Sequence, residues 1–310
     1  MNGPYARGSF GKRLIRDLKR NSGAYLMLLP TIILFLLFRY KPMCGIVIAF
    51  KNYRPGKEIF ECDWVGLKHF VSFFNSYYFT RLIKNTVVIG ISSLIFSFPM
   101  PIIFALLLNE VKNDKFKRVV QTVTYMPHFI SLVVMCGLIK QFTSSSGIIT
   151  QLMNLFGYEG GALLGHEEYF VPIYVISGIW QGMGWSSIVY LSALAGIDPG
   201  LYEAASIDGA NRWQLVRHIT LPGIRNTIIV MLLLQMGSVF NVGYEKVMLL
   251  YNESIYKTAD VISTFVYRKG LEQMQFSYST AVGLFNSLLN FIIVIVFNKI
   301  SRKVNETSLW

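Results

Sequence analysis

Few side chains of this 310-residue sequence have the type and spacing that catalysis or nucleotide binding requires. The stretch 166–170 (HEEYF) begins like the zinc-binding HExxH motif, but Phe170 stands where the second histidine is needed. The stretch 3–10 (GPYARGSF) has the glycine spacing of a phosphate-binding loop but lacks the lysine and hydroxyl residue required at its last two positions. The sequence therefore predicts neither a catalytic residue nor a nucleotide site in this chain.

The cysteines and histidines likewise indicate no metal site, redox site or proton relay. Cys44, Cys62 and Cys136 contain no CxxC pair, and whether Cys44 and Cys62 form a disulfide stays open at this point. His128 is the one titratable candidate inside the apolar segments, and a lone histidine after a proline is more often hydrogen-bonded to backbone. Ion-coupled carriers generally use carboxylates or paired histidines within the membrane. We therefore expect a passive channel or a subunit that receives its energy from a partner.

Long apolar segments make up most of the chain and must position the remaining residues. Hydrophobic residues account for 53% of the sequence and charged residues for 15%, and the mean hydropathy is +0.45. Soluble domains carry about 25% charged residues, and about 18 apolar residues can cross a bilayer as a helix. The 29 lysines and arginines exceed the 17 acidic residues, but they flank the apolar segments. This excess indicates contact with lipid head groups rather than with nucleic acid.

Six apolar segments predict an all-α integral membrane protein with six transmembrane helices. They are residues 24–50, 85–108, 122–139, 170–195, 224–242 and 280–297. The first is a retained helix with a break at Pro42, because no small-residue cleavage site follows it. Pro99 and Pro101 are expected to kink the second. The predicted regions are a basic tail 1–23, the first helix 24–50, an extracytoplasmic segment 51–84, a transmembrane domain 81–298 and a tail 299–310.

The short loops predict the orientation of the chain in the membrane. Lysine and arginine are concentrated in the N-terminal tail, in the loop 109–121, around the segment 198–222 and in the C-terminal tail. Cytoplasmic loops carry an excess of these residues. Both termini and the segment 198–222 are therefore expected in the cytoplasm, in a protein of the cell membrane.

The segment 198–222 is more elaborate than a hairpin between two membrane spans needs to be. Asp198 can cap a helix that starts at Pro199, and the pair Asp208-Gly209 predicts a turn because glycine accepts a left-handed backbone. Asn211 can cap a second short helix. Such a helix–turn–helix element is typical of a docking site for a partner, although an ordinary interfacial loop has a similar pattern.

The residue types within this segment resemble those of a known family. Residues 203–205 (EAA), 208–210 (DGA) and 219–222 (ITLP) resemble the EAA loop of type I ABC-importer permeases. The stretches WVGLKHF, LNEVKNDKFKRVVQTVTYMPHFIS and YSTAVGLFNSLLNFIIVIVFNK are similar to the oligosaccharide and polysaccharide branch of the carbohydrate permeases. The resemblance extends from Tyr25 to Lys299; Asn226 departs from it, since many members have proline there.

This resemblance implies a transporter subunit whose energy comes from elsewhere. It implies that the EAA loop (residues 198–222) contains a coupling helix on a cytoplasmic ATPase dimer, which holds the ATP and Mg, so that this chain binds no cofactor. The further partners would be a second permease forming a heterodimer, an extracytoplasmic solute-binding protein and a carbohydrate. The coupling residues implied in this way are Glu203, Ala204, Ala205, Asp208, Gly209, Ala210, Leu221 and Pro222. A stand-alone channel and a membrane scaffold that binds through the same loop are the alternatives.

The fourth and fifth apolar segments flank the EAA loop and, in similar permeases, line the central cavity. Aromatic rings and amide or hydroxyl groups suit a sugar, and the candidates are Trp180, Trp185, Tyr190, Gln235, Ser238 and Asn241. The same residue types also occur at membrane interfaces and in contacts between helices, so both roles remain open. The basic outer residues Lys51, Arg54, Arg268 and Lys269 fit either an acidic glycan or a docking site for the binding protein.

Overall fold

The computed structural model describes residues 17–305, and the regular structure among them is helical apart from one isolated bridge between Lys51 and Trp64. The first helices are α2 (Ser22–Phe35), α3 (Lys41–Met43), α4 (Lys68–Phe74), α5 (Phe79–Ser92), α6 (Pro99–Glu110), α7 (Asp114–Tyr125), α8 (Leu132–Phe142), α9 (Ile148–Asn154) and α10 (Glu167–Ala195). The others are α11 (Pro199–Ile207), α12 (Arg212–Leu215), α13 (Leu221–Gly223), α14 (Arg225–Met236), α15 (Tyr244–Leu250), α16 (Tyr256–Ala259), α17 (Ile262–Tyr267) and α18 (Phe276–Asn305). The all-α prediction is confirmed for the described residues; most of the predicted N-terminal tail and part of the C-terminal tail lie outside them.

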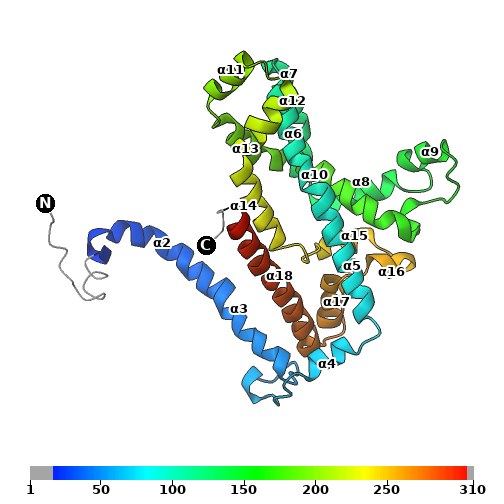
Figure 1. Cartoon of the computed structure of the whole chain (residues 1–310). Coiled ribbons are helices and arrows are strands. Elements are labelled where there is room, and N and C mark those ends of the chain that lie inside the picture. Colours follow the sequence, from blue (N-terminus) through cyan, green and yellow to red (C-terminus); the bar gives the residue numbers. More distant parts are fainter. Residues whose placement is uncertain (1–16, 306–310) are drawn as a thin grey trace.

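Within residues 17–305, three helical stretches are long and apolar enough to cross a membrane, namely Ser22–Phe50, Phe79–Glu110 and Phe276–Lys303 (Figure 1). Two further stretches qualify as bent pairs. Asp114–Phe129 and Leu132–Phe142 meet at 101°, and Arg212–Gly223 and Arg225–Met236 meet at 61°. The predicted third segment (122–139) is therefore bent, and the predicted fifth segment (224–242) begins at a bend.

Three of the helices widen into a π-helical turn shortly before a proline. These turns are Leu36–Tyr40, Ser93–Ser97 and Val216–Thr220, which precede Pro42, Pro99 and Pro222. A proline ring clashes with the carbonyl four residues earlier and supplies no N–H, so the wider turn accommodates it without ending the helix. The predicted break at Pro42 is accordingly not a break, because the helical path continues through Pro42 to Phe50.

Helix α10 is the central helix of the molecule and packs against α5, α6, α7, α14 and α16 (Figure 1). It has 29 residues but is not among the apolar candidate spans, because glycine and serine recur along it and two glutamates stand at its start. A Cβ atom on Gly184 would collide with the backbone carbonyl of Thr124 in α7. Small residues allow this close approach of helix backbones, which is typical of helix contacts within membranes.

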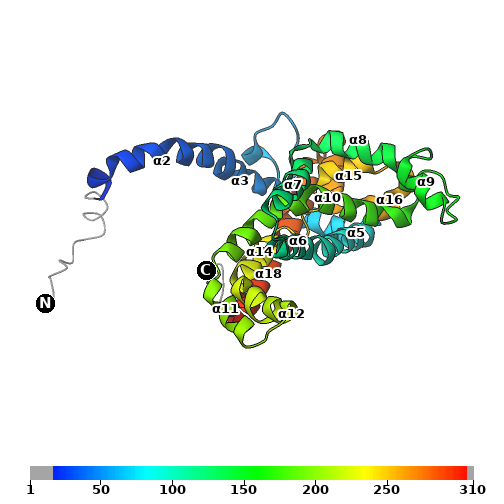
Figure 2. The ribbon, with the colours of Figure 1, turned by 90° about the horizontal axis from the view of Figure 1, so that it is seen from above.

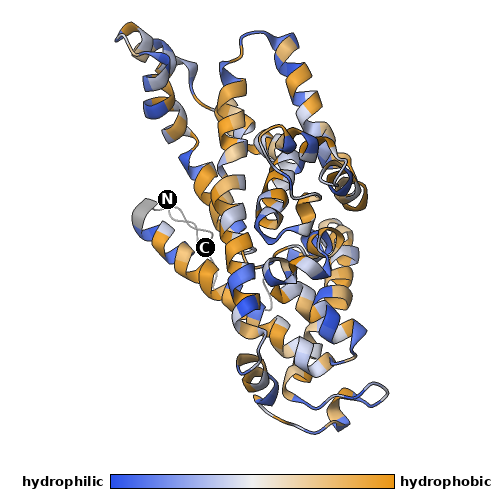
Figure 3. Cartoon of the chain, turned by 90° about the vertical axis from the view of Figure 1, so that its right-hand side faces the viewer, coloured by the Kyte–Doolittle hydropathy of each residue, from blue (hydrophilic) through white to orange (hydrophobic). Residues whose placement is uncertain are grey.

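The N-terminal helical stretch extends away from the other helices (Figures 1 and 2). None of the residues of α2 is buried, and hydrophobic residues cover most of the stretch (Figure 3). It joins the rest of the chain near its end, where the 3₁₀ turn Cys44–Phe50 packs against α18 and buries Ala49. This exposed apolar surface is compatible with a lipid environment.

A buried carboxylate ties α5 to the segment around α17. Asp260 is fully buried, and its Oδ2 atom accepts hydrogen bonds from Arg81 at 3.0 Å and from Arg268 at 2.8 Å. Thr264 donates to the other carboxylate oxygen at 2.9 Å. Burial lowers the pKa of Arg268, but the bonded Asp260 more than offsets this, so that the pKa of the guanidinium is raised. These bonds hold together two segments that are far apart in the sequence.

Replacing Gly184 by alanine is expected to lower the stability of the chain by about 1–3 kcal/mol, because the added methyl group forces α7 and α10 apart. The thermal unfolding midpoint of the purified protein in detergent measures this effect. Gly182→Ala is the matched control, since a Cβ atom at Gly182 of the same helix meets nothing within 4 Å. An equal midpoint for the two variants would contradict the close contact.

Replacing Asp260 by asparagine is expected to cost about 3–5 kcal/mol, because two half-buried arginines then lose their carboxylate. The control is Glu167→Gln, which removes the exposed pair with Lys257 at 3.5 Å and should cost at most about 1 kcal/mol. Thermal unfolding of both variants gives the comparison. A smaller loss for Asp260→Asn than for the control would show that the network is not stabilising.

Candidate functional site

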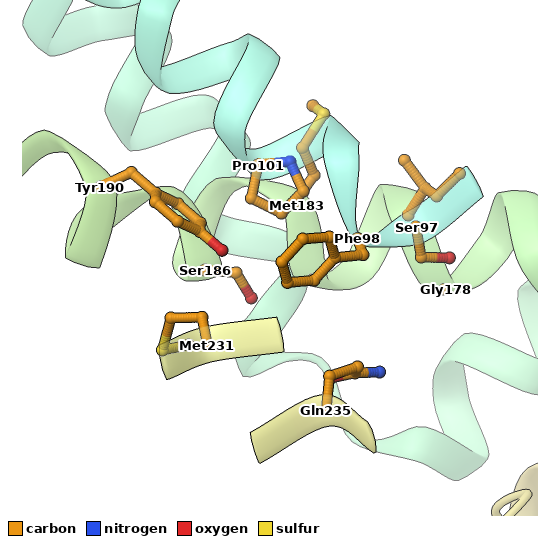
Figure 4. Close-up of a pocket in the computed structure, with 11 residues that line it drawn as sticks. Ser97, Phe98, Pro101, Gly178, Met183, Ser186, Tyr190, Met231 and Gln235 are labelled. Atoms are coloured by element: carbon orange, nitrogen blue, oxygen red, sulfur yellow. The ribbon is translucent and has the colours of Figure 1, made fainter. Parts of the chain in front are cut away.

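A cavity of about 160 Å³ lies beside the middle of α10, between α10, the junction of α5 with α6, and α14. Tyr190, Ser186 and Gln235 bring polar groups to its wall, and Phe98 lies opposite α10 (Figure 4). Tyr190 itself is buried, whereas Gln235 is exposed. The cavity therefore combines an aromatic face with hydroxyl and amide groups, the combination expected for a sugar.

A second cavity of about 160 Å³ lies next to the first, and Gln235 lines both. Ser238 and Asn241 line this second cavity together with Tyr174 of α10. It sits where α14 ends at Met236 and the chain runs without regular helix to α15. Four of the six predicted sugar-contact residues thus meet at two adjoining cavities.

Two asparagines of α18 support the non-helical chain at the second cavity. Asn290 accepts a hydrogen bond from the backbone N–H of Phe240 at 3.1 Å, and Asn286 donates to the side-chain oxygen of Asn241 at 3.2 Å. The same oxygen lies 3.5 Å from the Asn290 amide nitrogen. Asn241 therefore has a structural partner. The sequence analysis missed Asn286 and Asn290, although two asparagines one turn apart in an apolar span are themselves a signal of such bonding.

The two predicted tryptophans lie elsewhere. Trp180 lines an apolar groove of about 400 Å³ between α10 and α8, together with Ile139 and Phe142. Trp185 stacks on His128, with ring centroids 4.6 Å apart and planes 2° from parallel. Its ring also lies edge-on to Phe129, with centroids 5.7 Å apart, so among the described residues His128 makes ring contacts where a bond to backbone was expected. Neither tryptophan lines the two cavities.

The EAA loop has the local structure that its residues predict. Asp198 caps α11 by accepting the Gly200 N–H at 2.9 Å. Gly209 makes the turn with a φ of +83°, a conformation in which glycine costs least. Asn211 and Gln214 then form a capping box at the start of α12. These parts of the prediction are confirmed.

Contacts at its base hold the EAA loop to the core. The hydroxyl groups of Tyr202 and the buried Thr220 are hydrogen-bonded at 3.1 Å, which links α11 to the chain returning toward α14. Gly223 lies so close to Ile197 that a Cβ atom there would be 2.7 Å from the isoleucine side chain. The loop is therefore braced rather than loosely tethered, and it lies at one end of the molecule (Figure 1).

The tip of the EAA loop is exposed and partly apolar. Ile207 is 87% exposed and Trp213 is 70% exposed. A groove of about 330 Å³ runs between the two short helices, lined by residues that include Asp208, Gly209 and His218. Of the predicted coupling residues, Ala205, Ala210 and Leu221 are half-buried, and Glu203, Ala204, Asp208, Gly209 and Pro222 are exposed. Large exposed apolar side chains at such a point are typical of a docking surface.

Residues 97–306 match the family described as binding-protein-dependent transport system inner membrane component. The chain belongs to this family. The matched residues include α10 and α14, which line both cavities, and the whole EAA loop. The permease is thus a membrane-embedded subunit of a transport system, and a stand-alone channel or scaffold is set aside.

Full-length relatives and solved structures agree with this assignment. The permease is 45% identical to the Polygalacturonan/rhamnogalacturonan transport system permease protein YteP of Bacillus subtilis (strain 168), with 96% of this chain and 94% of the relative covered. It is 46% identical to a chain of a bacterial ABC transporter involved in the import of the acidic polysaccharide alginate, with coverage of 94% and 99% and a TM-score of 0.87. A bacterial alginate ABC transporter in complex with an alginate pentasaccharide-bound periplasmic protein matches at 45% identity, with coverage of 96% and 100% and a TM-score of 0.88. The predicted class, a permease subunit of an ABC importer rather than an enzyme, is confirmed.

Other groups considered in the sequence do not form a reactive site within residues 17–305. Cys44, Cys62 and Cys136 are free thiols, and Cys44 is exposed whereas Cys62 is buried. The described residues contain no group of three or more side chains placed to hold a metal ion. His166 contacts Glu168 at 4.0 Å and the carbonyl of Gly160, near the start of α10.

Removing the Tyr202 hydroxyl (Tyr202→Phe) is expected to weaken the brace of the EAA loop by about 1 kcal/mol, the usual net value of one hydrogen bond. Backbone amides in residues 199–215 should then exchange with solvent about fivefold faster, as measured by hydrogen exchange of the purified permease. Ser206→Ala is the control, because that hydroxyl bonds the Tyr202 carbonyl within its own helix. Unchanged exchange in Tyr202→Phe would refute the brace.

Proposed function

We propose that the permease forms half of the translocation pathway of an ABC importer for acidic oligosaccharides, in the cell membrane. In this assembly it pairs with a second permease, receives substrate from an extracytoplasmic solute-binding protein and is driven by a cytoplasmic ATPase dimer. The ATP and Mg belong to that dimer, and this chain binds no cofactor. The observation that carries the proposal is the likeness of about 45% identity, over nearly the full chain, to permeases of polyuronide transport.

The substrate class rests on the relatives and on the cavities together. Polygalacturonan and alginate are polymers whose sugar units carry carboxylates, and the permease is 45% and 46% identical to proteins named for their transport. Its cavities present Tyr190, Ser186, Gln235 and Ser238, which suit the ring faces and hydroxyl groups of a sugar. Each cavity of about 160 Å³ is smaller than the 300–1,000 Å³ of a typical ligand site, so the second permease supplies the opposite wall.

The energy input rests on the EAA loop. Its exposed tip bears Ile207 and Trp213, and a groove beside Gly209 gives a partner a recess to fill. The base of the loop is braced through Tyr202 and continues directly into α10 and α14. A displacement of the ATPase is thereby passed to the helices that line the cavities, as rigid-body switching between outward and inward access requires.

The proposed topology has six spans with both termini in the cytoplasm. Three helical stretches meet the length and composition test alone, and Asp114–Phe129 with Leu132–Phe142 meets it as a bent pair. Helix α14 meets it only together with Arg212–Gly223, most of which belongs to the EAA loop, and is counted here as the fifth span. Helix α10 is the remaining span, the fourth along the chain; its 29 residues give a length of about 44 Å, more than the roughly 30 Å of the bilayer core. Six spans return the C-terminus to the side of the N-terminus. The EAA loop follows the fourth span, so in this topology it lies on that side as well.

Uptake by the reconstituted importer tests the proposed function. The permease, its partner permease, its ATPase and its binding protein are placed in proteoliposomes with ATP inside, and a radiolabelled uronate oligosaccharide is added outside. ATP-dependent accumulation is expected, whereas liposomes without the ATPase should show none. Uptake that proceeds without the ATPase, or that accepts no carboxylated sugar, would refute the proposal.

Replacing Gly209 by valine is expected to lower uptake and ATPase association at least tenfold while membrane insertion persists. The residue has a φ of +83°, and a Cβ atom there meets nothing within 4 Å in the chain, so the space beside it is free for a partner. The readouts are co-purification with the ATPase and ATP-dependent uptake.

Gly157→Val is the matched control for this prediction. Gly157 has a φ of +91° and equally open surroundings, so valine causes the same backbone strain at a site remote from the EAA loop. The Gly157→Val variant should still co-purify with the ATPase and support uptake. Normal uptake in Gly209→Val, or equal loss in both variants, would show that the loop is not the coupling surface.

A further inference from the structure

Lys246 is a buried lysine whose charged end reaches the wall of the cavities. It lies in α15, with 8% of its surface exposed, and α15 packs against α8. Its ammonium donates a hydrogen bond to the backbone carbonyl of Tyr174 in α10 at 2.8 Å. The same ammonium lies 4.4 Å from the centre of the Tyr174 ring. The lysine thus crosses from α15 to α10 and is held there by a carbonyl and an aromatic face.

This positive charge has no carboxylate partner among residues 17–305, where the ion pairs within 4.0 Å involve other cations. Burying an ammonium without a counter-charge is costly, and one carbonyl and one ring offset the lost hydration only in part. A methionine of similar length would pack α15 against α10 without this cost. An ionisable residue kept at such a cost is by default a functional candidate.

The ammonium lies next to two residues of α10 that line the cavities. Tyr174, to which it is bonded, lines the second cavity. Gly178, one helical turn further along α10, lines the first cavity, and a Cβ atom there would be 3.4 Å from the lysine nitrogen. Because Gly178 has no side chain, the ammonium can approach the part of the α10 backbone that lines the first cavity. At such short range and away from bulk water, a single charge acts strongly.

We propose that Lys246 is the counter-charge for the carboxylates of acidic sugar units as they pass the two cavities. This inference rests on the proposed function, since it requires an acidic substrate. The ammonium stabilises a carboxylate beside Gly178 and Tyr174, and a mobile substrate supplies the negative charge that the chain itself does not place there. Arginine retains this charge, whereas glutamine keeps a donor for the Tyr174 carbonyl but loses the charge.

The test compares a charged substrate with its neutral analogue in the complete importer, reconstituted with its own partner subunits. Wild type, Lys246→Gln, Lys246→Met and Lys246→Arg are assayed for uptake of a galacturonate oligosaccharide and of the same oligosaccharide with methyl-esterified carboxyls. Each substrate is supplied at a concentration that saturates the binding protein, as measured beforehand. Lys246→Gln and Lys246→Met should lower uptake of the acid about tenfold relative to the ester, which corresponds to about 1.4 kcal/mol. Lys246→Arg should keep the wild-type ratio.

Several outcomes would overturn the assignment. An equal loss for both substrates in the neutral variants would make Lys246 a structural tie between α15 and α10. An unchanged ratio of acid to ester uptake in Lys246→Gln would show that the charge of Lys246 plays no part in substrate recognition. Failure of both neutral variants to assemble, with Lys246→Arg intact, would make the charge a requirement of folding. If the wild type takes up the ester but not the acid, the proposed function itself is overturned. This outcome is distinct from a failure of the Lys246 proposal, because it is seen in the wild type without any substitution.

Discussion

The close backbone contact between α10 and its neighbours is the constraint on which the rest of the permease depends. Gly184 of α10 lies so close to the backbone carbonyl of Thr124 in α7 that no side chain would fit between them. In a bilayer, apolar side chains gain little by leaving lipid for one another, so helices associate through small residues and polar contacts. This explains why the most central helix is also too polar to qualify as a span by hydropathy. The same helix lines both cavities and leads into the EAA loop, so one rigid element connects them.

The interruption after α14 is compensated by specific side chains and coincides with the second cavity. After α14 ends, the backbone N–H of Phe240 is satisfied by Asn290, and Asn286 holds the Asn241 side chain. Non-helical backbone at membrane depth is tolerated where it lines a cavity, and this segment lines the second cavity. Part of the polar character of this cavity wall therefore follows from the hydrogen bonds that support non-helical backbone.

Local features of the fold could be predicted from the sequence, and long-range ones could not. The caps at Asp198 and Asn211 and the turn at Gly209 depend on residues within a few positions, and the structure has all of them. The 101° bend between α7 and α8 and the early end of α14 depend on packing and on partners such as Asn290, 50 residues from the backbone it supports. Lys246 looks like one more basic residue of an outer segment until its bond to Tyr174, 72 residues away, places it beside the cavities.

In the proposed transport cycle, the braced EAA loop and the small cavities together require whole helices to move. A loop that bent easily would absorb a displacement at its tip, but the Tyr202 bond and the contact of Gly223 with Ile197 join its two ends to each other and to the core. A displacement at the tip must then move α10 and α14 with it. Two cavities of about 160 Å³ each are too small to enclose an oligosaccharide, which is why the proposed pathway is formed by two permease subunits together. In that proposal this chain contributes one wall of the pathway and the EAA loop that moves it.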